Sequence, residues 1–75
     1  MTKEEFEKVI VNMNFPDADV LGSKYGFYIR ALTVDGVAQF GTMDYNINRL
    51  NVAIKTTIDN DYYNGSIIIS VENWG

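Results

Sequence analysis

The sequence contains neither cysteine nor histidine. Without cysteine, the chain has no disulfide, thiolate metal site or thiol nucleophile, and this composition is typical of a reducing compartment. Without histidine, Ser-His-Asp and Cys-His catalytic arrangements are excluded, and the commonest general base and metal ligand is missing. We therefore expect a cytoplasmic protein that is not an enzyme and that holds no metal or cofactor.

Long hydrophobic runs are missing as well. No apolar stretch approaches the ~20 residues that a membrane span requires, so we expect no membrane partner. Residues 1–5 are charged and lead into an amphipathic segment, which is unlike a secretory signal peptide. The sequence Asn64-Gly65-Ser66 is formally a glycosylation sequon, but we interpret it as a turn.

The composition indicates one small folded domain that spans residues 1–75. With 47% hydrophobic and 13% aromatic residues, the chain is too apolar to be a disordered tail. Ten acidic against six basic residues give a formal net charge of -4. This charge opposes direct binding to the phosphate backbone of nucleic acids, so we expect a protein partner instead.

Residues 2–13 carry the pattern of one amphipathic helix. Thr2 and Glu5 have the spacing of a capping box, in which each side chain accepts a hydrogen bond from the other residue's backbone amide. Apolar residues recur at helical spacing in this segment, namely Phe6, Val9, Ile10 and Met13. The pattern predicts a helix that Phe15-Pro16-Asp17 ends, followed by a connector over 17–24.

The Asp35-Gly36 dipeptide lies between two segments rich in β-branched and aromatic residues. It predicts a hairpin of residues 25–34 and 37–42 in which Val34 faces Val37. Alternation then assigns to the core face Phe27, Ile29, Ala31, Ala38 and Phe40. The outer face is more apolar than a face fully exposed to solvent usually is. Its residues are Tyr28, Arg30, Leu32, Val34, Val37, Gln39 and Met43.

Residues 46–58 fit both a helical stripe and the alternation of a strand. The high content of β-branched residues favours the strand. If Asn64-Gly65 is a two-residue turn, Tyr62 faces Ile67 and Ile58 faces Val71, and the aliphatic residues share one face. The predicted fold is therefore α+β, with an N-terminal helix packed on a four-stranded antiparallel sheet built from two hairpins.

Two short motifs suggest ligands but lack the required spacing. The segment 22–26 is similar to a phosphate-binding loop, yet it lacks the Lys-Ser/Thr order and the flanking strand and helix. Asp59-Asn60-Asp61 resembles the start of a calcium loop, but no glutamate stands at its closing position. We expect turn and connector chemistry at both places and no metal site.

The outward face of the last hairpin combines carboxylates with aromatic rings. Aromatic residues with polar tips dominate binding hot spots, and carboxylates attract a basic partner. The predicted partner-binding residues are Asp59, Asp61, Tyr62, Tyr63, Glu72 and Trp74. The alternative is that the acids only keep the strand soluble and discourage edge pairing, while the rings cover neighbouring residues.

In its size, acidity and lack of catalytic groups the chain resembles phage-encoded inhibitors, including anti-CRISPR proteins, that occupy nucleic-acid-binding surfaces of larger enzymes. This compositional resemblance implies a non-enzymatic protein-binding module that blocks a basic surface of a partner protein. The alternative is a structural or regulatory subunit that forms a homodimer. The residues for such self-association lie on the outer face of the first hairpin, at Tyr28, Leu32, Val34 and Val37, unless the connector or the loop after Thr42 covers them.

Overall fold

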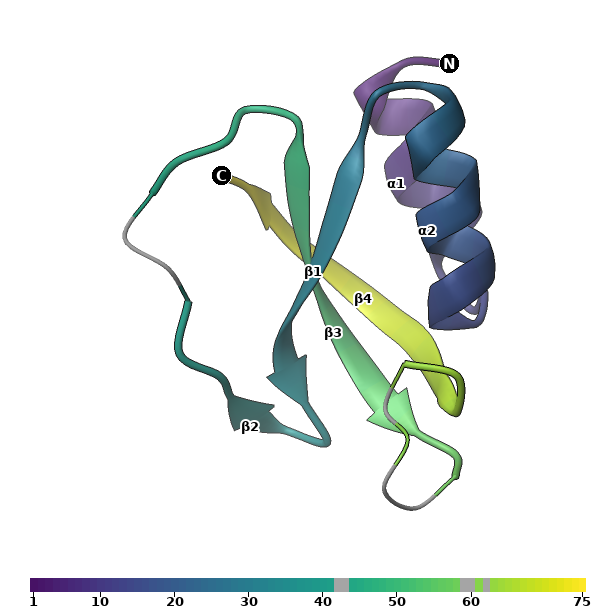
Figure 1. Cartoon of the computed structure of the whole chain (residues 1–75), viewed down its shortest axis with the longest axis vertical. Coiled ribbons are helices and arrows are strands. Elements are labelled where there is room, and N and C mark those ends of the chain that lie inside the picture. The colour runs from purple at the N-terminus through teal and green to yellow at the C-terminus, as the bar shows by residue number, and fades with distance from the viewer. Residues whose placement is uncertain (42–43, 59–60, 62) are drawn as a thin grey trace.

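The computed structural model describes residues 1–41, 44–58, 61 and 63–75. Its elements are α1 (Lys3–Ile10), α2 (Phe15–Lys24), β1 (Tyr28–Val34), β2 (Val37–Ala38), β3 (Arg49–Thr56) and β4 (Ser66–Trp74). Both helices lie on the same side of the four-stranded sheet (Figure 1). The fold is therefore α+β with helices before strands, as the sequence predicts, but it has a second helix.

Helix α1 begins as predicted and ends earlier. The amide of Glu5 donates to Thr2 Oγ1 at 3.1 Å, and the amide of Thr2 donates to Glu5 Oε1 at 2.9 Å, which completes the capping box. After Ile10 the chain makes a turn in which Asn12 has a positive φ of 74°, and it then pairs with β4. The amide of Asn12 donates to the carbonyl of Ile68 at 2.8 Å, and that of Ile68 donates to the carbonyl of Met13 at 2.9 Å.

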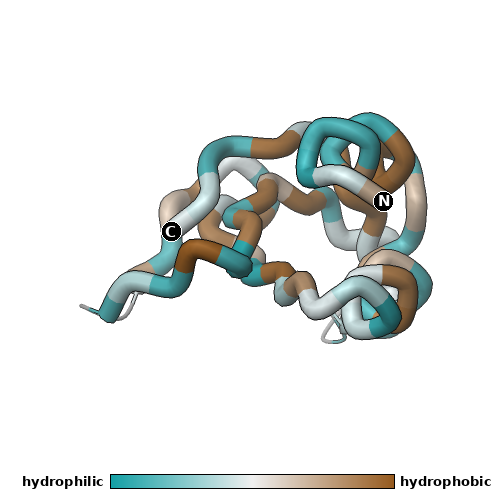
Figure 2. Tube along the Cα trace, turned by 90° about the horizontal axis from the view of Figure 1, so that it is seen from above, coloured by the Kyte–Doolittle hydropathy of each residue, from teal (hydrophilic) through white to brown (hydrophobic). Residues whose placement is uncertain are grey.

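The prediction of a connector over 17–24 is wrong, because these residues belong to α2. Asn14 caps this helix by accepting a hydrogen bond from the amide of Asp17 at 3.0 Å. Pro16 lies in the first turn, where its missing N–H has no helical partner to lose. The residues interpreted as a helix stop therefore start the next helix. Seen from above, hydrophobic and hydrophilic stretches alternate along both helices (Figure 2).

The first hairpin is confirmed at its turn but is short. Val34 pairs with Val37, and Asp35 and Gly36 have positive φ values of 52° and 82°. These values suit the tight turn that the Asp-Gly dipeptide predicts. Strand β2 ends after Ala38, so the assignment of Ala38 and Phe40 to the core is wrong, and both side chains are exposed.

The sheet is mixed, and its strand order is β2-β1-β3-β4. The two hairpin pairs are antiparallel as predicted, whereas β1 and β3 are parallel, with Tyr28 beside Arg49 and Val34 beside Ile54. A parallel neighbour requires the chain to return to the end of the sheet where β1 began. Residues 39–48, which we call the crossover, make that return, and the prediction of a wholly antiparallel sheet is wrong.

Strand β3 confirms the strand interpretation of residues 46–58 for Arg49–Thr56, but its pairing with β4 differs from the prediction. Ile54 pairs with Ile68, and Val52 pairs with Val71, so Ile58 does not face Val71. A loop over 57–65 replaces the two-residue turn, and in it the amide of Gly65 donates to the carbonyl of Asp61 at 2.8 Å. The predicted partner of Ile67, Tyr62, lies outside the described residues.

Three β-bulges explain which side chains reach the core. The pairing registers leave Leu32 on β1, and Ile69 and Glu72 on β4, as extra residues opposite β3. Each bulge reverses the alternation of the following residues. On β4 the residues in contact with the core are consequently spaced by three, at Ile68, Val71 and Trp74. Ile67 and Ile69, which the sequence pattern assigns to the buried face, are exposed.

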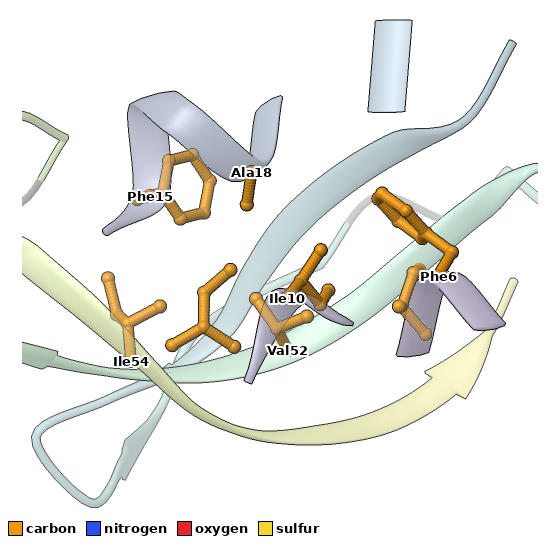
Figure 3. Close-up of a cluster of buried hydrophobic side chains, with 8 residues drawn as sticks. Phe6, Ile10, Phe15, Ala18, Val52 and Ile54 are labelled. Carbon is orange, nitrogen blue, oxygen red and sulfur yellow. The ribbon is translucent and has the colours of Figure 1, made fainter. Parts of the chain in front are cut away.

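The core lies between the helices and the sheet (Figure 3). Phe6 and Ile10 of α1 and Phe15 and Ala18 of α2 point toward β3, and they bury its aliphatic side chains. The buried residues contributed by the sheet are Leu50, Val52, Ile54 and Ile68. In the part of the chain that the structure describes, no helix is long and apolar enough to cross a membrane.

Candidate interaction surfaces

Tyr63, one of the predicted partner-binding residues, lies beside α2. Its hydroxyl donates to Asp19 Oδ2 at 2.8 Å, and its ring meets the ring of Phe15 edge to face, with centroids 5.4 Å apart. The hydrogen bond to the Asp19 carboxylate raises the pKa of Tyr63, because the carboxylate stabilises the protonated phenol. These contacts fasten the loop over 57–65 to α2.

Trp74, the second predicted aromatic anchor, faces the helices at the other end of the sheet. Its indole Nε1 donates to Glu7 Oε2 at 3.1 Å, and Lys3 Nζ lies 4.6 Å from the ring centroid. The ring also packs against Phe27, with centroids 5.3 Å apart. Trp74 is therefore a half-buried contact between β4 and α1.

The predicted carboxylates have separate local partners. Glu72 is a bulge residue whose Oε1 accepts a hydrogen bond from Thr33 Oγ1 at 2.9 Å. Asp61 accepts hydrogen bonds from the amide and the side chain of Asn64, at 3.0 and 3.2 Å. Asp59 and Tyr62 lie outside the described residues.

The described members of the predicted strip therefore lie on different parts of the molecule. Tyr63 contacts α2, Trp74 contacts α1, and Glu72 bonds to β1. The predicted pairing of the last hairpin placed them together because it omitted the loop over 57–65 and the two bulges on β4. Their partner-binding role stays a prediction.

The outer face of the first hairpin is only partly as predicted. Tyr28 and Val37 are exposed, and Leu32 is half-buried. Val34 packs against the core cluster instead of facing outward. The bulge at Leu32 causes this change, because it brings both Ala31 and Val34 to the side of the sheet that carries the helices.

Polar side chains form a row on the sheet face opposite the helices. Arg30 Nε donates to Asn51 Oδ1 at 2.8 Å, and Asn51 Nδ2 donates to Asn73 Oδ1 at 2.7 Å. These three residues are direct neighbours across β1, β3 and β4. Asn51 is only 3% exposed, and its bonds satisfy a buried amide. The middle of this face is therefore polar.

Large apolar side chains are exposed around the crossover instead. Phe40 is fully exposed, at 108% of its reference area, and Tyr45 is 72% exposed. Val37 and Ile47 at the two ends are also exposed. We call these four residues the crossover surface. Its members come from one stretch of chain that leaves β2 and returns to β3 (Figure 1).

Arg49 holds the second half of the crossover in place. Its Nη1 and Nη2 donate to Asp44 Oδ2 and to the Asp44 carbonyl at 3.2 and 3.1 Å, and its Nε donates to the carbonyl of Gly75 at 2.9 Å. The Arg49 side chain is 15% exposed, whereas the side chain of Asp44 is 61% exposed. Lys3 adds a hydrogen bond from α1 to the carbonyl of Ile47. The exposed side chains of Tyr45 and Ile47 thus project from a fastened backbone.

Of the crossover surface, sequence reasoning identified Val37 and missed Phe40, Tyr45 and Ile47. The hairpin pattern extends the second strand to Thr42 and so assigns Phe40 to the core, whereas β2 ends at Ala38. A signal is present in the sequence: Phe40, Tyr45 and Ile47 follow one another without the alternation of a strand or the period of a helix. Large apolar residues without either period, next to glycine and asparagine, indicate an apolar loop.

A cleft of about 530 Å³ lies between α2 and β1. Phe15 and Asp19 line it from α2, Ile29 and Ala31 line it from β1, and Tyr63 borders it from the loop over 57–65. A cleft of this size is within the usual range for ligand sites, which is roughly 300–1,000 Å³.

Among the described residues, no group of three or more histidine, cysteine, aspartate or glutamate side chains could hold a metal ion. Comparisons with models of protein families, with curated proteins and with solved structures found no match.

Proposed function

We propose that this protein is a non-enzymatic protein-binding module that inhibits its partner by occupying a functional surface through the crossover surface. The observation that carries the proposal is the full exposure of Phe40 on a crossover that Arg49 anchors at Asp44. Large exposed apolar side chains that follow one another along one segment of a small protein indicate an interaction site, because their contact with water is unfavourable in a free monomer.

The hydrogen bonds between Arg49 and Asp44 are a second feature, besides the exposed side chains, that favours binding. A segment that is already ordered loses less conformational entropy when a partner docks on it. Arg49 bonds both the side chain and the carbonyl of Asp44, so the backbone beside Tyr45 is held before binding. Phe40 and Tyr45, on either side of residues 42–43, are both exposed for contact with a partner. Aromatic residues such as Phe40 and Tyr45 are the usual anchors of such contacts.

The net charge of -4 directs the choice of partner. A negatively charged module associates faster with a positively charged surface, and salt screens this attraction. We therefore propose that the partner presents a basic surface around an apolar depression, as a nucleic-acid-binding protein does. The association rate falls with rising ionic strength in this proposal, while the dissociation rate changes less.

The test compares two apolar residues that are both exposed. A photo-reactive phenylalanine at position 40 captures the partner from cells that make the protein, and the purified partner is then titrated with Phe40→Ser and with the matched control Val20→Ser on α2. Truncating a hot-spot side chain costs about 2 kcal/mol or more, which corresponds to roughly thirtyfold weaker binding for Phe40→Ser. The affinity of Val20→Ser stays close to that of the natural protein. Equal affinities for both variants contradict the proposal.

The carboxylates of the last hairpin are tested on the same pair of proteins. Asp59, Asp61 and Glu72 are replaced by asparagine or glutamine, and the association rate is measured at several salt concentrations. A slower association with a flatter salt dependence supports their part in attracting the partner. An unchanged rate shows that these carboxylates take no part.

Self-association is the second candidate, and the exposure of Tyr28 and Val37 favours it, because both are large apolar residues of the first hairpin. Sedimentation at several concentrations distinguishes the two functions. A dimer that Leu32→Asp and Phe40→Ser disperse supports self-association. A monomer at all concentrations excludes it and leaves the partner-binding proposal.

A further inference from the structure

The edge of β1 away from β3 is mostly open. On that side β2 pairs only with Thr33 and Val34, and the amide of Gln39 adds one bond to the carbonyl of Leu32 at 2.7 Å. In the part of the chain that the structure describes, no strand lies there beside residues 28–31. An open strand edge carries backbone groups that can pair with another strand.

The register identifies the backbone groups at this edge. The amide of Tyr28 donates to the carbonyl of Asn48 at 2.8 Å, so Tyr28 faces β3. In a parallel pair, alternate residues of a strand bond to the same neighbour. Arg30 is therefore the next residue that faces β3, and Ile29 and Ala31 present their N–H and C=O groups to the open side.

The cleft beside α2 opens along this same edge. Ile29, Arg30 and Ala31 all line it. Successive side chains of a strand point to opposite faces of the sheet, so three consecutive residues can line one cleft only if it reaches the edge between the two faces. A strand that binds at the open edge of β1 can therefore pair with its backbone and bury side chains in the cleft at the same time.

The side chains that line the cleft determine which residue types are favoured in an added strand. On the helix side Phe15, Ile29, Ala31 and Val34 give the cleft an apolar lining that fits apolar side chains of an added strand. The Asp19 carboxylate, which also lines the cleft, accepts the hydrogen bond of the Tyr63 hydroxyl. On the other face Arg30 lies in the row with Asn51. The residue of the added strand opposite Arg30 is favoured when it is acidic, because opposite charges stabilise directly facing residues.

A second copy of the same edge is a poor occupant. An antiparallel pair in which Ile29 bonds to Ala31 of the other copy is centred on Arg30. Each Arg30 then faces its equivalent at the closer, non-hydrogen-bonded position of the ladder. Like charges that face each other directly are destabilising.

We infer that the open edge of β1 binds an extended segment of a partner protein as an added antiparallel strand, with an acidic residue opposite Arg30 flanked by apolar residues that enter the cleft beside α2. This surface adds a second contact to the proposed partner-binding function and is separate from Phe40. Binding of a strand here depends on Ile29 to Ala31, whereas the proposed crossover contact depends on Phe40, so either can fail alone.

The test uses the whole protein and a synthetic peptide, acetyl-Thr-Val-Glu-Val-Thr-amide, followed by ¹H–¹⁵N NMR. The expected result is a saturable shift of the amide signals of Ile29 and Ala31, with smaller shifts in α1. The same peptide with methylated backbone nitrogens at both valines keeps its side chains but cannot donate to the edge, and it is expected not to bind. Equal binding of both peptides, or no shift of Ile29 and Ala31, overturns the inference.

A charge exchange tests the residue opposite Arg30. Arg30→Glu is expected to weaken the glutamate peptide about two- to fivefold and to strengthen by a similar factor the peptide with lysine at that position. Strengthened lysine-peptide binding shows that the variant is folded, and Phe40→Ser is expected to bind the original peptide normally. If Arg30→Glu still binds the glutamate peptide more tightly than the lysine peptide, the assignment of the acidic residue is wrong. Concentration-dependent shifts of Ile29 and Ala31 without peptide indicate a second copy and overturn the inference as well.

Discussion

Trp74 and Glu7 join the last strand to the first helix, since the indole Nε1 donates to the Glu7 carboxylate at 3.1 Å. The two residues are 67 positions apart in the chain. Trp74 also lies under the ammonium group of Lys3, one turn before Glu7 on α1. The helix therefore holds both the edge and the face of this ring, and this contact fixes the end of β4.

Replacement of Trp74 by phenylalanine tests this contact. The variant keeps an aromatic ring but loses the donor to Glu7, and a hydrogen bond to a charged group contributes about 1.5–3 kcal/mol. We expect the free energy of unfolding in urea to fall by an amount in that range. Glu7→Gln keeps an acceptor oxygen and is expected to cost less. Equal losses in both variants contradict the importance of the donor.

The turn aspartate predicts a specific pH dependence of stability. Thr56 Oγ1 donates to Asp35 Oδ2 at 2.6 Å and its amide donates to Asp35 Oδ1 at 2.8 Å, and these bonds lower the pKa of Asp35 below its usual value of 3.8. A lowered pKa means that folding favours the ionised carboxylate. The stabilisation is therefore complete above the unfolded pKa and is lost as the pH falls through the lower folded pKa.

Asp35→Asn isolates this contribution, because asparagine also tolerates the positive φ of this position. Unfolding of the natural protein and of Asp35→Asn is measured from neutral pH down to strongly acidic pH. The stability difference is expected to be largest above pH 3.8 and to shrink below it. Glu5, whose pKa its bonds to Thr2 lower, affects both proteins equally and cancels. A difference independent of pH contradicts the prediction.

Gly22 is required by the close approach of α2 to the chain that follows it. A Cβ at this position lies 2.9 Å from the carbonyl oxygen of Phe27 and 3.0 Å from Phe6 Cζ. Alanine favours a helix by about 1 kcal/mol over glycine, but forcing an extra group into a packed site costs about 1–3 kcal/mol. We expect Gly22→Ala to lower the melting temperature, whereas Ser23→Ala at the next, exposed position leaves it nearly unchanged. A more stable Gly22→Ala variant contradicts this packing.

For Ser66 we expect that replacement by alanine stabilises the protein. Its side chain is 1% exposed, and among the described residues its Oγ has no hydrogen-bond partner. A buried polar group without a partner costs about 1–3 kcal/mol, so removing the hydroxyl is favourable. We expect Ser66→Ala to raise the free energy of unfolding, and Ser70→Ala on the exposed part of the same strand to leave it unchanged. A destabilised Ser66→Ala variant shows that the hydroxyl is bonded.

The features that the sequence predicts correctly are local. Thr2 and Glu5 form the capping box because they are three residues apart, and Asp35-Gly36 closes its hairpin because both residues accept positive φ. The alternation of Leu50, Val52 and Ile54 identifies β3 because all three side chains face the core. In each case the physical cause lies within a few residues of chain.

The features that it misses depend on distant partners. The parallel pairing of β1 with β3 is set by where the crossover returns, which no local pattern encodes. The register of β4 puts Ile68 rather than Ile67 on the helix side, and because the two bulges at Ile69 and Glu72 cancel, Trp74 lies on the same side as Ile68. Helix α2 was hidden by Pro16 and Gly22, which usually interrupt helices but here lie at a first turn and at a close packing contact.

For the candidate site, the sequence likewise predicts the local feature, the residue types, but not the positions that depend on distant contacts. The sequence identifies aromatic and acidic residues as the chemistry of binding, but it assigns Phe40 to the core and Trp74 to the surface. The structure reverses both positions, since Phe40 is fully exposed and Trp74 packs against Phe6 and Phe27. Which aromatic ring is available to a partner is decided by the length of β2 and by the register in which β4 pairs with β3, not by the residue types.

Strand β3 has neighbours on both edges and little exposure on either face of its middle. Leu50, Val52 and Ile54 are covered by the helices, while Asn51 and Ala53 on the reverse face are 3% and 7% exposed. Its amides can meet solvent only when most of the molecule opens, so their hydrogen–deuterium exchange reports global unfolding. The amides of β2, a two-residue strand at the sheet edge, exchange through local fraying instead, and the crossover joins this weakly protected strand to the strongly protected β3.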